Sequence, residues 1–346
     1  MFDSACEWLL GEPPSTATIR SCPEDFQVFE QLPFEPDGEG EHLFLYIRKR
    51  GENTDWVARQ LANFCQISPR DVGYAGKKDR HAVTEQWFSV RLPIGRTLNW
   101  SLFGGDSIDV LHSCRHSRKL RLGALSGNRF VIRLRDLTEP EAFVERVEKI
   151  RQGVPNFFGE QRFGNAGGNL DKGLALLEGR LRERQRHKKG LYISALRSWL
   201  FNQVINARIK QGLWDRILPG DVLMLDGSQS CFMADDAPDL MDRLQRGDVH
   251  LTGPMWGRGE LMTRDEAAAF EQAALAPAQS VCQGLESLGL NQERRALRLI
   301  PKALAAREAS EGQWILEFEL PSGAFATSVL RELCQWQNAA ASAEVN

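Results

Sequence analysis

The sequence predicts a mixed α and β protein (class α+β) with two domains. Its 346 residues are more than one hydrophobic core usually serves, so two domains are the better expectation. Segments near both ends alternate apolar and polar residues, as in DFQVFE at 25–30 and WILEFEL at 314–320, which is the period of a strand. Residues from about 155 to 295 follow mainly the period of helices. We therefore expect one sheet-containing domain built from both ends and a mostly helical insertion.

The N-terminal part of the chain contains the expected strands and two helices. One helix is expected over 53–65, where Val57, Leu61 and Phe64 lie on one face. The capping-box sequence TEPE at 138–141 opens a second helix, which ends at a glycine. The strands are expected at 25–30, 42–47, 87–92 and 130–134.

In the middle of the chain the apolar residues recur mainly at helical spacing, and a strand pattern occurs only briefly, as at 221–225. After residue 312 the alternating pattern returns, and a short helix follows around 327–333. The central helices are expected at 168–184, 194–212, 236–246 and 263–275. The predicted domains are therefore 1–153 with 297–346, interrupted by an inserted domain at 154–296.

Composition and cysteine usage predict a cytoplasmic globular protein. The chain is 42% hydrophobic and 26% charged, with a net charge of -3. Its seven cysteines are scattered, and no CxxC pair or Cys/His cluster suggests a zinc site. This usage suits a reducing compartment. We see no signal peptide and no apolar run long enough to span a membrane.

Basic residues gather in three runs although the chain as a whole is slightly acidic. Residues 115–135 contain seven Lys or Arg and no acid, and 180–189 contain six with one acid. A third run lies at 294–302. Each run alone could equally be a solvated face, but three together favour a polyanion as partner. RNA is favoured over duplex DNA, because aromatic residues lie among the basic ones and no DNA-reading motif is found.

The stretch GYAGKKDRHAVTEQWFSV at 73–90 places one acid, Asp79, among four basic residues. It is not a nucleotide phosphate loop, because Asp71 and Lys78 occupy positions where that motif needs Gly and Ser or Thr. Asp79 then either forms a structural ion pair or is a catalytic carboxylate that acts as nucleophile or base. Two preceding glycines would let backbone and substrate approach closely. The residues alone leave both interpretations open.

The same stretch resembles the signature of the TruD family of tRNA pseudouridine synthases, and the resemblance continues over nearly the whole chain. Several long motifs in the right order are far more specific than one short pattern. The further motifs are PEDFQVFE at 23–30, FEPDGEGEH at 34–42, KLRLGALSGNRF at 119–130, VPNFFGEQRFG at 154–164 and LPSGAFATSVLREL at 320–333.

The resemblance implies a pseudouridine synthase catalytic domain with a mixed, largely antiparallel sheet, and an inserted TruD-specific domain. It implies an isomerase that acts on uridine-13 of tRNA without a cofactor or metal. The N1–C1′ bond of the uridine would break and a C5–C1′ bond would form. The target base would first have to leave its stack.

The resemblance also implies roles for individual residues. Asp79 falls on the family's catalytic aspartate, and would either attack the substrate or remove a ribose proton. Arg20 stands where the family more often has Lys. Pattern alone would place each phenylalanine of a strand in the core. The substrate contacts implied are Arg20, Phe26, Asn128, Phe130 and Phe325, and the weaker RNA contacts are Lys77, Lys78, Arg80, Lys119, Arg121 and Arg162.

Two other functions are compatible with parts of this pattern. A non-catalytic RNA-binding protein or RNA chaperone would use the same basic surface with a steep salt dependence. An RNA N-glycosidase would break the same bond and release uracil. We expect tRNA as partner, no membrane or protein partner, and a monomer.

Overall fold

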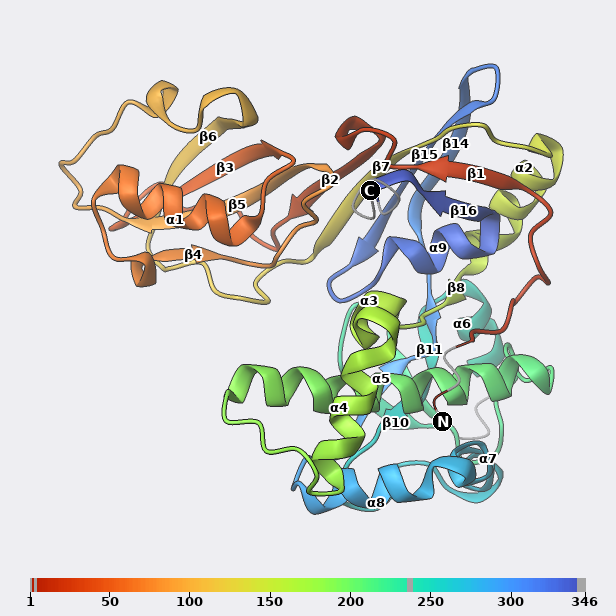
Figure 1. Ribbon diagram of the computed structural model, residues 1–346. Helices are drawn as coiled ribbons and strands as arrows, with labels where there is room; N and C mark the ends of the chain where they lie inside the picture. Colours follow the sequence, from red (N-terminus) through yellow and green to blue (C-terminus); the bar gives the residue numbers. More distant parts are fainter. Residues whose placement is uncertain (1, 3–4, 235–238, 341–346) are drawn as a thin grey trace. The chain divides into compact units, whose positions relative to one another are not determined.

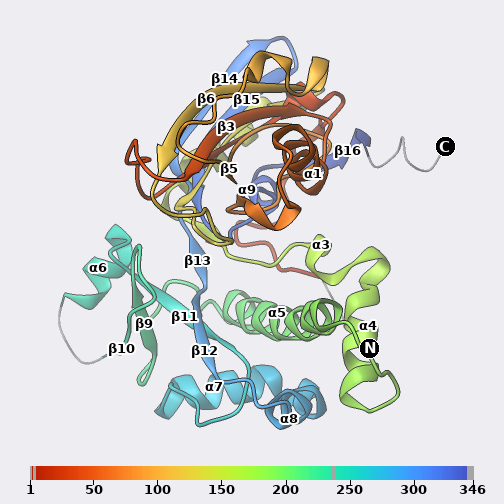
Figure 2. The same cartoon turned by 90° about the vertical axis from the view of Figure 1, so that its left-hand side faces the viewer.

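The computed structural model describes residues 2, 5–234 and 239–340 (Figures 1 and 2). The chain forms two compact units. The helical unit comprises Met1–Glu12, Lys149–Ile300 and Ala324–Glu332, and the sheet unit comprises Pro13–Glu148, Pro301–Gly323 and Leu333–Asn346. Residues 236–238 of one predicted helix and 341–346 of the predicted C-terminal domain segment lie outside the described residues.

The sheet unit is built on an eight-stranded mixed sheet in the order β14-β15-β7-β2-β5-β3-β6, with β4 paired to β5. Only β2 and β5 run parallel among these pairs; the other pairs are antiparallel. The mixed, largely antiparallel sheet that the resemblance implied is thereby confirmed. The strands are β2 (Phe26–Gln31), β3 (His42–Arg50), β4 (Val72–Tyr74), β5 (Val83–Arg91), β6 (Ile108–His116), β7 (Gly127–Leu134), β14 (Lys302–Ser310) and β15 (Gln313–Pro321).

Helix α1 (Thr54–Cys65) covers one end of this sheet (Figure 1). Val57 and Leu61 are fully buried against β3 and β5, and Phe64 packs at the edge of the same cluster, as the periodicity predicted. Helix α2 (Pro140–Lys149) buries Phe143, which meets Trp314 of β15 edge to face at 5.5 Å. The first and last strands, β1 (Thr16–Ile19) and β16 (Gln335–Asn338), pair in parallel.

The helical unit surrounds α5 (Arg186–Lys210), a helix of 25 residues that lies inside the unit (Figure 1). Apolar side chains such as Leu196, Leu200 and Phe201 are fully buried along it. It packs against α3 (Glu160–Phe163), α4 (Gly168–Leu177) and α7 (Asp265–Leu275), and the unit also contains α6 (Leu240–Arg246) and α8 (Gln279–Ser287).

This unit contains more sheet than the sequence suggested. Four antiparallel strands, in the order β10-β9-β11-β12, replace the brief strand expected at 221–225. The strands are short, and β11 contains Gly253 and Pro254, which normally argue against a strand. Their bounds are β9 (Val222–Leu225), β10 (Cys231–Met233), β11 (Val249–Met255) and β12 (Glu293–Ala296), with β8 (Val154–Pro155) and β13 (Arg298–Leu299) forming a separate pair.

Two helix ends were also predicted wrongly. Helix α4 ends at Leu177 rather than 184, because Gly179 takes a left-handed φ of +72° that stops the helix. Helix α5 begins at Arg186 rather than 194, so its first turns contain basic residues instead of the apolar ones that marked the predicted start.

Two segments near the chain ends, Met1–Glu12 and Ala324–Glu332, belong to the helical unit, whereas the predicted boundaries placed them in the other domain. In helix α9 (Ala326–Leu333), Arg331 donates hydrogen bonds to the carbonyls of Cys6 and Glu7, at 2.8 and 2.9 Å. Ser328 donates to the carbonyl of Phe157 at 2.9 Å. None of the described helices combines the length and apolar character that crossing a membrane demands.

Candidate active site

Asp79 lies in the loop between β4 and β5, with its carboxylate open to solvent. Its Oδ2 accepts a hydrogen bond from Nη2 of Arg20 at 2.7 Å. The Asp79 side chain is 42% exposed, whereas that of Arg20 is 7% exposed. A reachable carboxylate is therefore held by a guanidinium that is itself buried in the protein.

The position of Arg20 depends on an unusual backbone conformation. Arg20 directly follows β1 and has φ +57°, in the left-handed region that few residues other than glycine adopt. Strain of this kind costs about 1 kcal/mol or more and is typical of functional sites. The guanidinium carbon lies 3.9 Å from the centre of the Phe26 ring. Burial lowers the pKa of Arg20, and the charge of Asp79 opposes that shift.

Three buried polar side chains fix the main chain of the loop. Lys49 at the end of β3 donates to the carbonyl of Asp79 at 3.0 Å. Thr54 of α1 accepts from the amide of Lys78 at 3.0 Å and donates to Gln86 of β5 at 2.8 Å. The Gln86 amide in turn donates to the carbonyl of Gly76 at 3.1 Å. The loop is thus tied to three different elements of the sheet unit.

Lys49 is the most unusual of these side chains, because its ammonium is fully buried. It also donates to the carbonyl of Glu52 at 2.7 Å, and it forms no ion pair with a carboxylate among the described residues. Burial lowers the pKa of Lys49 to about 8, although the nearby charge of Asp79 acts to raise it.

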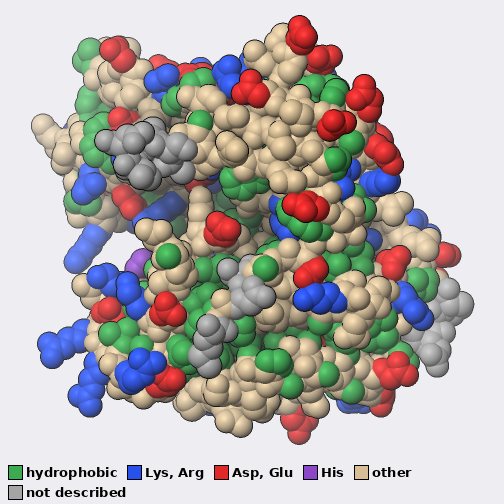
Figure 3. Space-filling model, turned by 45° about the vertical axis from the view of Figure 1, so that its right-hand side comes forward, with side chains coloured by type: hydrophobic (Ala, Val, Ile, Leu, Met, Phe, Trp, Pro, Cys, Tyr) green, Lys and Arg blue, Asp and Glu red, His purple; other side chains and the backbone are tan. Residues whose placement is uncertain are grey.

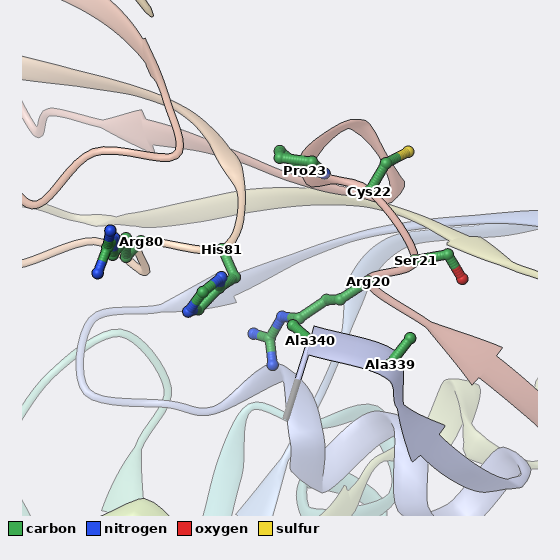
Figure 4. A pocket seen from close by; sticks show the side chains of 8 residues that line it. All are labelled: Arg20, Ser21, Cys22, Pro23, Arg80, His81, Ala339 and Ala340. Carbon is green, nitrogen blue, oxygen red and sulfur yellow. The ribbon is translucent and has the colours of Figure 1, made fainter. Parts of the chain in front are cut away.

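A cavity of about 440 Å³ opens beside Arg20. In Figure 4 the Arg20 guanidinium and the His81 ring face the same space from opposite sides, and Arg80 follows on the side of His81. The cavity is large enough for a small ligand such as one nucleotide base. Its lining residues are Arg20, Ser21, Cys22, Pro23, Arg80, His81, Ala339 and Ala340.

The predicted aromatic contacts of the sheet unit lie beneath this site. The Phe26 and Phe130 rings meet edge to face at 6.3 Å, and Phe130 stacks on Phe318 at 5.3 Å. Phe26 and Phe130 are 2% and 7% exposed, so both are core residues in this structure. Asn128 pairs with Glu30 across β2 and β7, and its buried Oδ1 has no hydrogen-bond partner among the described residues.

The basic residues of the loop differ in how open they are. Lys78 forms a buried ion pair with Glu30 at 2.6 Å, and Glu30 also accepts from the amide of Trp87. Lys77 forms an exposed ion pair with Asp55 at 2.6 Å. The ammonium of Lys78 is therefore occupied inside the protein, while Lys77 remains on the surface.

The other predicted RNA contacts and the loop glycines are also located. Arg80 and Arg121 are exposed, and Lys119 donates to the carbonyl of Arg70. A Cβ on Gly73 would lie 2.2 Å from the carbonyl oxygen of Leu120, so this glycine allows close packing of the backbone rather than access for a substrate.

Arg162 and Phe325 belong to the helical unit. The Arg162 guanidinium lies 5.2 Å from the ring centre of Phe158 and donates to Ser194 at 3.3 Å. Burial lowers the pKa of Arg162. Phe325 meets the same Phe158 ring edge to face at 6.1 Å. The residues that the structure brings together around Asp79 are those of the sheet unit.

The chain matches the family model for tRNA pseudouridine synthase D (TruD) over residues 5–187 and 177–333. The chain belongs to the TruD family. This confirms the resemblance found in the sequence, and the mixed fold class with it. The TruD family is one of pseudouridine synthases, which are isomerases.

Similar proteins cover almost the full length of this TruD-family chain. The tRNA pseudouridine synthase D of Aeromonas hydrophila subsp. hydrophila is 48% identical over 335 residues, which span 96% of this chain and 94% of the relative. That of Shewanella oneidensis is 47% identical, spanning 97% and 90%. A crystal structure from Methanosarcina mazei named for TruD has a TM-score of 0.73 at 22% identity, covering 98% and 97%, and shows the likeness of fold.

The side chains that fix the Asp79 loop, namely Lys49, Thr54 and Gln86, were not predicted from the sequence. A signal for Lys49 was present. In β3, Leu45, Ile47 and Lys49 are all buried and lie two residues apart, so strand alternation places the lysine on the inward face. A lysine at an inward position of an apolar strand is rare. Thr54 and Gln86 carry no comparable signal, because Thr and Gln are common at helix starts and in strands.

Proposed function

We propose that this TruD-family chain isomerises uridine-13 of tRNA to pseudouridine, and that Asp79 is its catalytic residue. The reaction and substrate class are supported by the family and by relatives named tRNA pseudouridine synthase D. The match of loop 73–90 to the family signature supports Asp79 and the position in tRNA. The observation that carries the proposal is the open carboxylate of Asp79, 2.7 Å from a buried guanidinium.

The reaction rearranges bonds within one nucleotide. The N1–C1′ bond breaks, the uracil turns, and C5 bonds to C1′. The proton on C5 leaves and N1 takes up a proton, so the product is an isomer of the substrate. The balance therefore requires no cofactor. Asp79 would either attack the substrate or remove a ribose proton, and both routes need an ionised carboxylate.

The surroundings of Asp79 suit this role. Arg20 would stabilise the negative charge and orient the carboxylate, because it is buried and stacked on Phe26. The cavity beside Arg20 would receive the uracil after it leaves its stack. The buried amide oxygen of Asn128 would accept a hydrogen bond when substrate or a moving side chain supplies a donor.

We assign the units to parts of this function. The sheet unit would be the catalytic domain, since Arg20, Phe26, Asp79, Asn128 and Phe130 all belong to it. The helical unit would be the TruD-specific insertion around predicted residues 154–296, with Arg162 as a further RNA contact, and it also contains the proposed substrate contact Phe325. Exposed cations of the sheet unit, such as Arg80 and Arg121, would contact phosphates of the tRNA.

Carbodiimide mapping of pseudouridine in unmodified tRNA tests the proposal. Wild-type protein without added cofactor should produce a new signal at uridine-13. Asp79→Asn should produce none, while retaining the fold and most tRNA affinity. Asp248→Asn is a matched control, because Asp248 is 51% exposed and also paired with an arginine. It should keep full activity.

Two outcomes would overturn the proposal in different ways. A signal from Asp79→Asn at the wild-type rate would exclude Asp79 as the catalytic residue. A wild-type signal at another uridine would leave the chemistry intact and exclude the assigned position.

A further inference from the structure

The segment 180–189, here called the arginine segment, connects α4 to α5 and enters the first turn of α5 in the helical unit. Its six cations are all exposed. The main-chain amide of Leu181 donates to the carbonyl of Ala175 at 2.9 Å, which anchors the start of the segment. In the view of Figure 3, Lys and Arg side chains project together from the lower left edge of the molecule, where the connection between α4 and α5 lies. The cations are Arg180, Arg182, Arg184, Arg186, Lys188 and Lys189.

Most of these cations have no carboxylate partner in the described part of the chain, whereas some exposed cations elsewhere in the chain are paired with an acid. Arg91, Lys210 and Arg246, whose side chains are 60%, 62% and 62% exposed, each form an ion pair with an acid. In the arginine segment only Arg180 does so, with Glu178. The other five cations form no ion pair within the described residues, and the one acid of the segment, Glu183, accepts from the amide of Gln185 instead.

The position of the segment relative to α5 is also unfavourable for the isolated protein. The first turn of α5 has no acidic residue, whereas α1, α4 and α7 each have at least one. The N-terminus of a helix carries a partial positive charge, so cations there oppose the helix dipole. Mutual repulsion among five uncompensated cations adds to that cost. A bound phosphate would compensate both the cations and the helix terminus.

We propose that the arginine segment is a docking surface for the phosphate backbone of the RNA substrate. The proposal rests on the proposed function for the identity of the RNA, a tRNA. Contacts of this kind supply affinity and position without reading sequence. The surface therefore contributes to binding and leaves the chemical step to the sheet unit.

A salt titration of tRNA binding tests this surface. The test variant carries Arg182→Gln, Arg184→Gln and Lys188→Gln. The control carries Arg91→Gln, Lys210→Gln and Arg246→Gln, which removes the same charge from ion-paired positions. Each lost phosphate contact lowers the slope of log affinity against log salt by about 0.7 to 0.9. The magnitude of that slope should therefore be smaller by about 2 to 3 for the test variant than for wild type, and almost unchanged for the control.

Activity measurements complete the test. The test variant should bind tRNA about 3- to 100-fold more weakly at physiological salt and reach the wild-type rate at saturating tRNA. Equal slopes for the two variants, or an unchanged slope for the test variant, would overturn the docking surface. Failure of the wild type to form pseudouridine would overturn the proposed function instead, since the binding comparison does not depend on turnover.

A second inference comes from the fully buried Lys49. Its ammonium is held by two main-chain carbonyls, those of Glu52 and Asp79, at 2.7 and 3.0 Å. A buried charge without a carboxylate partner is costly. An apolar side chain could fill this position without the free-energy cost of burying a charge, as Leu45 and Ile47 do on the same face of β3.

We infer that Lys49 is a positioning residue for Asp79, which fixes the main chain of the loop and supplies a positive charge beneath the carboxylate. Arg20 would act on the side-chain atoms of Asp79 and Lys49 on its backbone. The other charged groups that influence Lys49 are Lys78 and Glu52, and its cross-strand neighbours Thr84 and Ile108 carry no charge.

The test compares Lys49→Met and Lys49→Arg with wild type in single-turnover assays from pH 6.5 to 9.5. Losing a hydrogen bond from a charged group should slow Lys49→Met about 10- to 100-fold at pH 7, with tRNA affinity unchanged. Because the pKa of Lys49 is about 8, the wild-type rate should fall toward the Met variant as the pH rises past that value. Lys49→Arg stays charged and should not show this fall.

A role limited to folding would give a different result. Thr54→Val removes a neutral hydrogen bond to the same loop and is the comparison variant. The inference is wrong if folded Lys49→Met turns over at the wild-type rate. It is also wrong if the ratio of the wild-type turnover rate to the Lys49→Met turnover rate stays constant from pH 6.5 to 9.5.

Discussion

Keeping Lys49 charged inside the sheet unit should cost stability in a way that depends on pH. The pKa of Lys49 is lowered from 10.5 to about 8. Between these values the unfolded chain holds the proton and the folded protein does not, so unfolding takes up a proton. The free energy of unfolding therefore rises with pH through this window. This gain in the free energy of unfolding is fully present above pH 10.5. It decreases as the pH falls and is lost once the pH has fallen through 8.

The size of the effect follows from the shift. One pH unit corresponds to about 1.4 kcal/mol, so the window is worth about 3 kcal/mol. Lys49→Met lacks this contribution. The free energy of unfolding of wild type minus that of the variant should therefore increase by about 3 kcal/mol between pH 7.5 and pH 10.5. The variant also loses the hydrogen bonds to Asp79 and Glu52. That loss adds a constant to the difference in free energy of unfolding and does not alter how the difference changes with pH.

Urea unfolding at a series of pH values measures this difference. If the two units unfold separately, the transition to use is that of the sheet unit, which contains Lys49. All other titrating groups are common to both proteins, so their contributions cancel. Lys210→Met is the control for loss of a lysine side chain, because Lys210 is 62% exposed and its surface ion pair with Glu7 should contribute little to stability. A pH-independent difference for Lys49→Met would refute the argument that burial destabilises its charged form.

Three further predictions concern other parts of the site and the core. Arg20→Met should slow turnover about 10- to 100-fold in single-turnover assays by removing the charged hydrogen bond to Asp79, and unchanged turnover would exclude Arg20 from the site. Asn128→Leu should lower activity without lowering the thermal midpoint, because its buried oxygen has no partner to lose; a large fall in that midpoint would contradict this. Arg208→Met should destabilise the helical unit by about 3 to 5 kcal/mol in urea unfolding, since it leaves Asp221 buried and unpaired, and adding Asp221→Leu should recover most of the loss.

Local periodicity was sufficient for the elements of the sheet unit whose burial alternates. In β2 every second side chain is buried, and in α1 Val57 and Leu61 face the core as expected. The middle of the chain was harder. Helix α5 is buried around most of its circumference from Tyr192 onward, and its exposed basic first turn gives no apolar stripe to mark where it begins. The short strands β9 to β12 become evident only when their partners are known.

The sequence pointed to Asp79 through its motif but could not supply most of its partners. Arg20 and Asp79 are 59 residues apart, and their contact depends on the left-handed turn at Arg20. Lys49 is 30 residues from Asp79 and reaches its carbonyl only because β3 and β5 pair in register. Lys78, expected to meet RNA, turns inward to Glu30 instead. Contacts of this kind follow from tertiary packing, which periodicity does not contain.

The central claim is that the Asp79 carboxylate carries out the isomerisation. Pseudouridine formation releases the hydrogen at C5 of the target uridine, so tRNA tritiated at that carbon reports turnover directly. Under single-turnover conditions wild-type protein should release one tritium per tRNA, at uridine-13. Asp79→Asn, with tRNA affinity and thermal midpoint close to wild type, should release none above background. Release by Asp79→Asn at a rate near that of wild type would contradict the account.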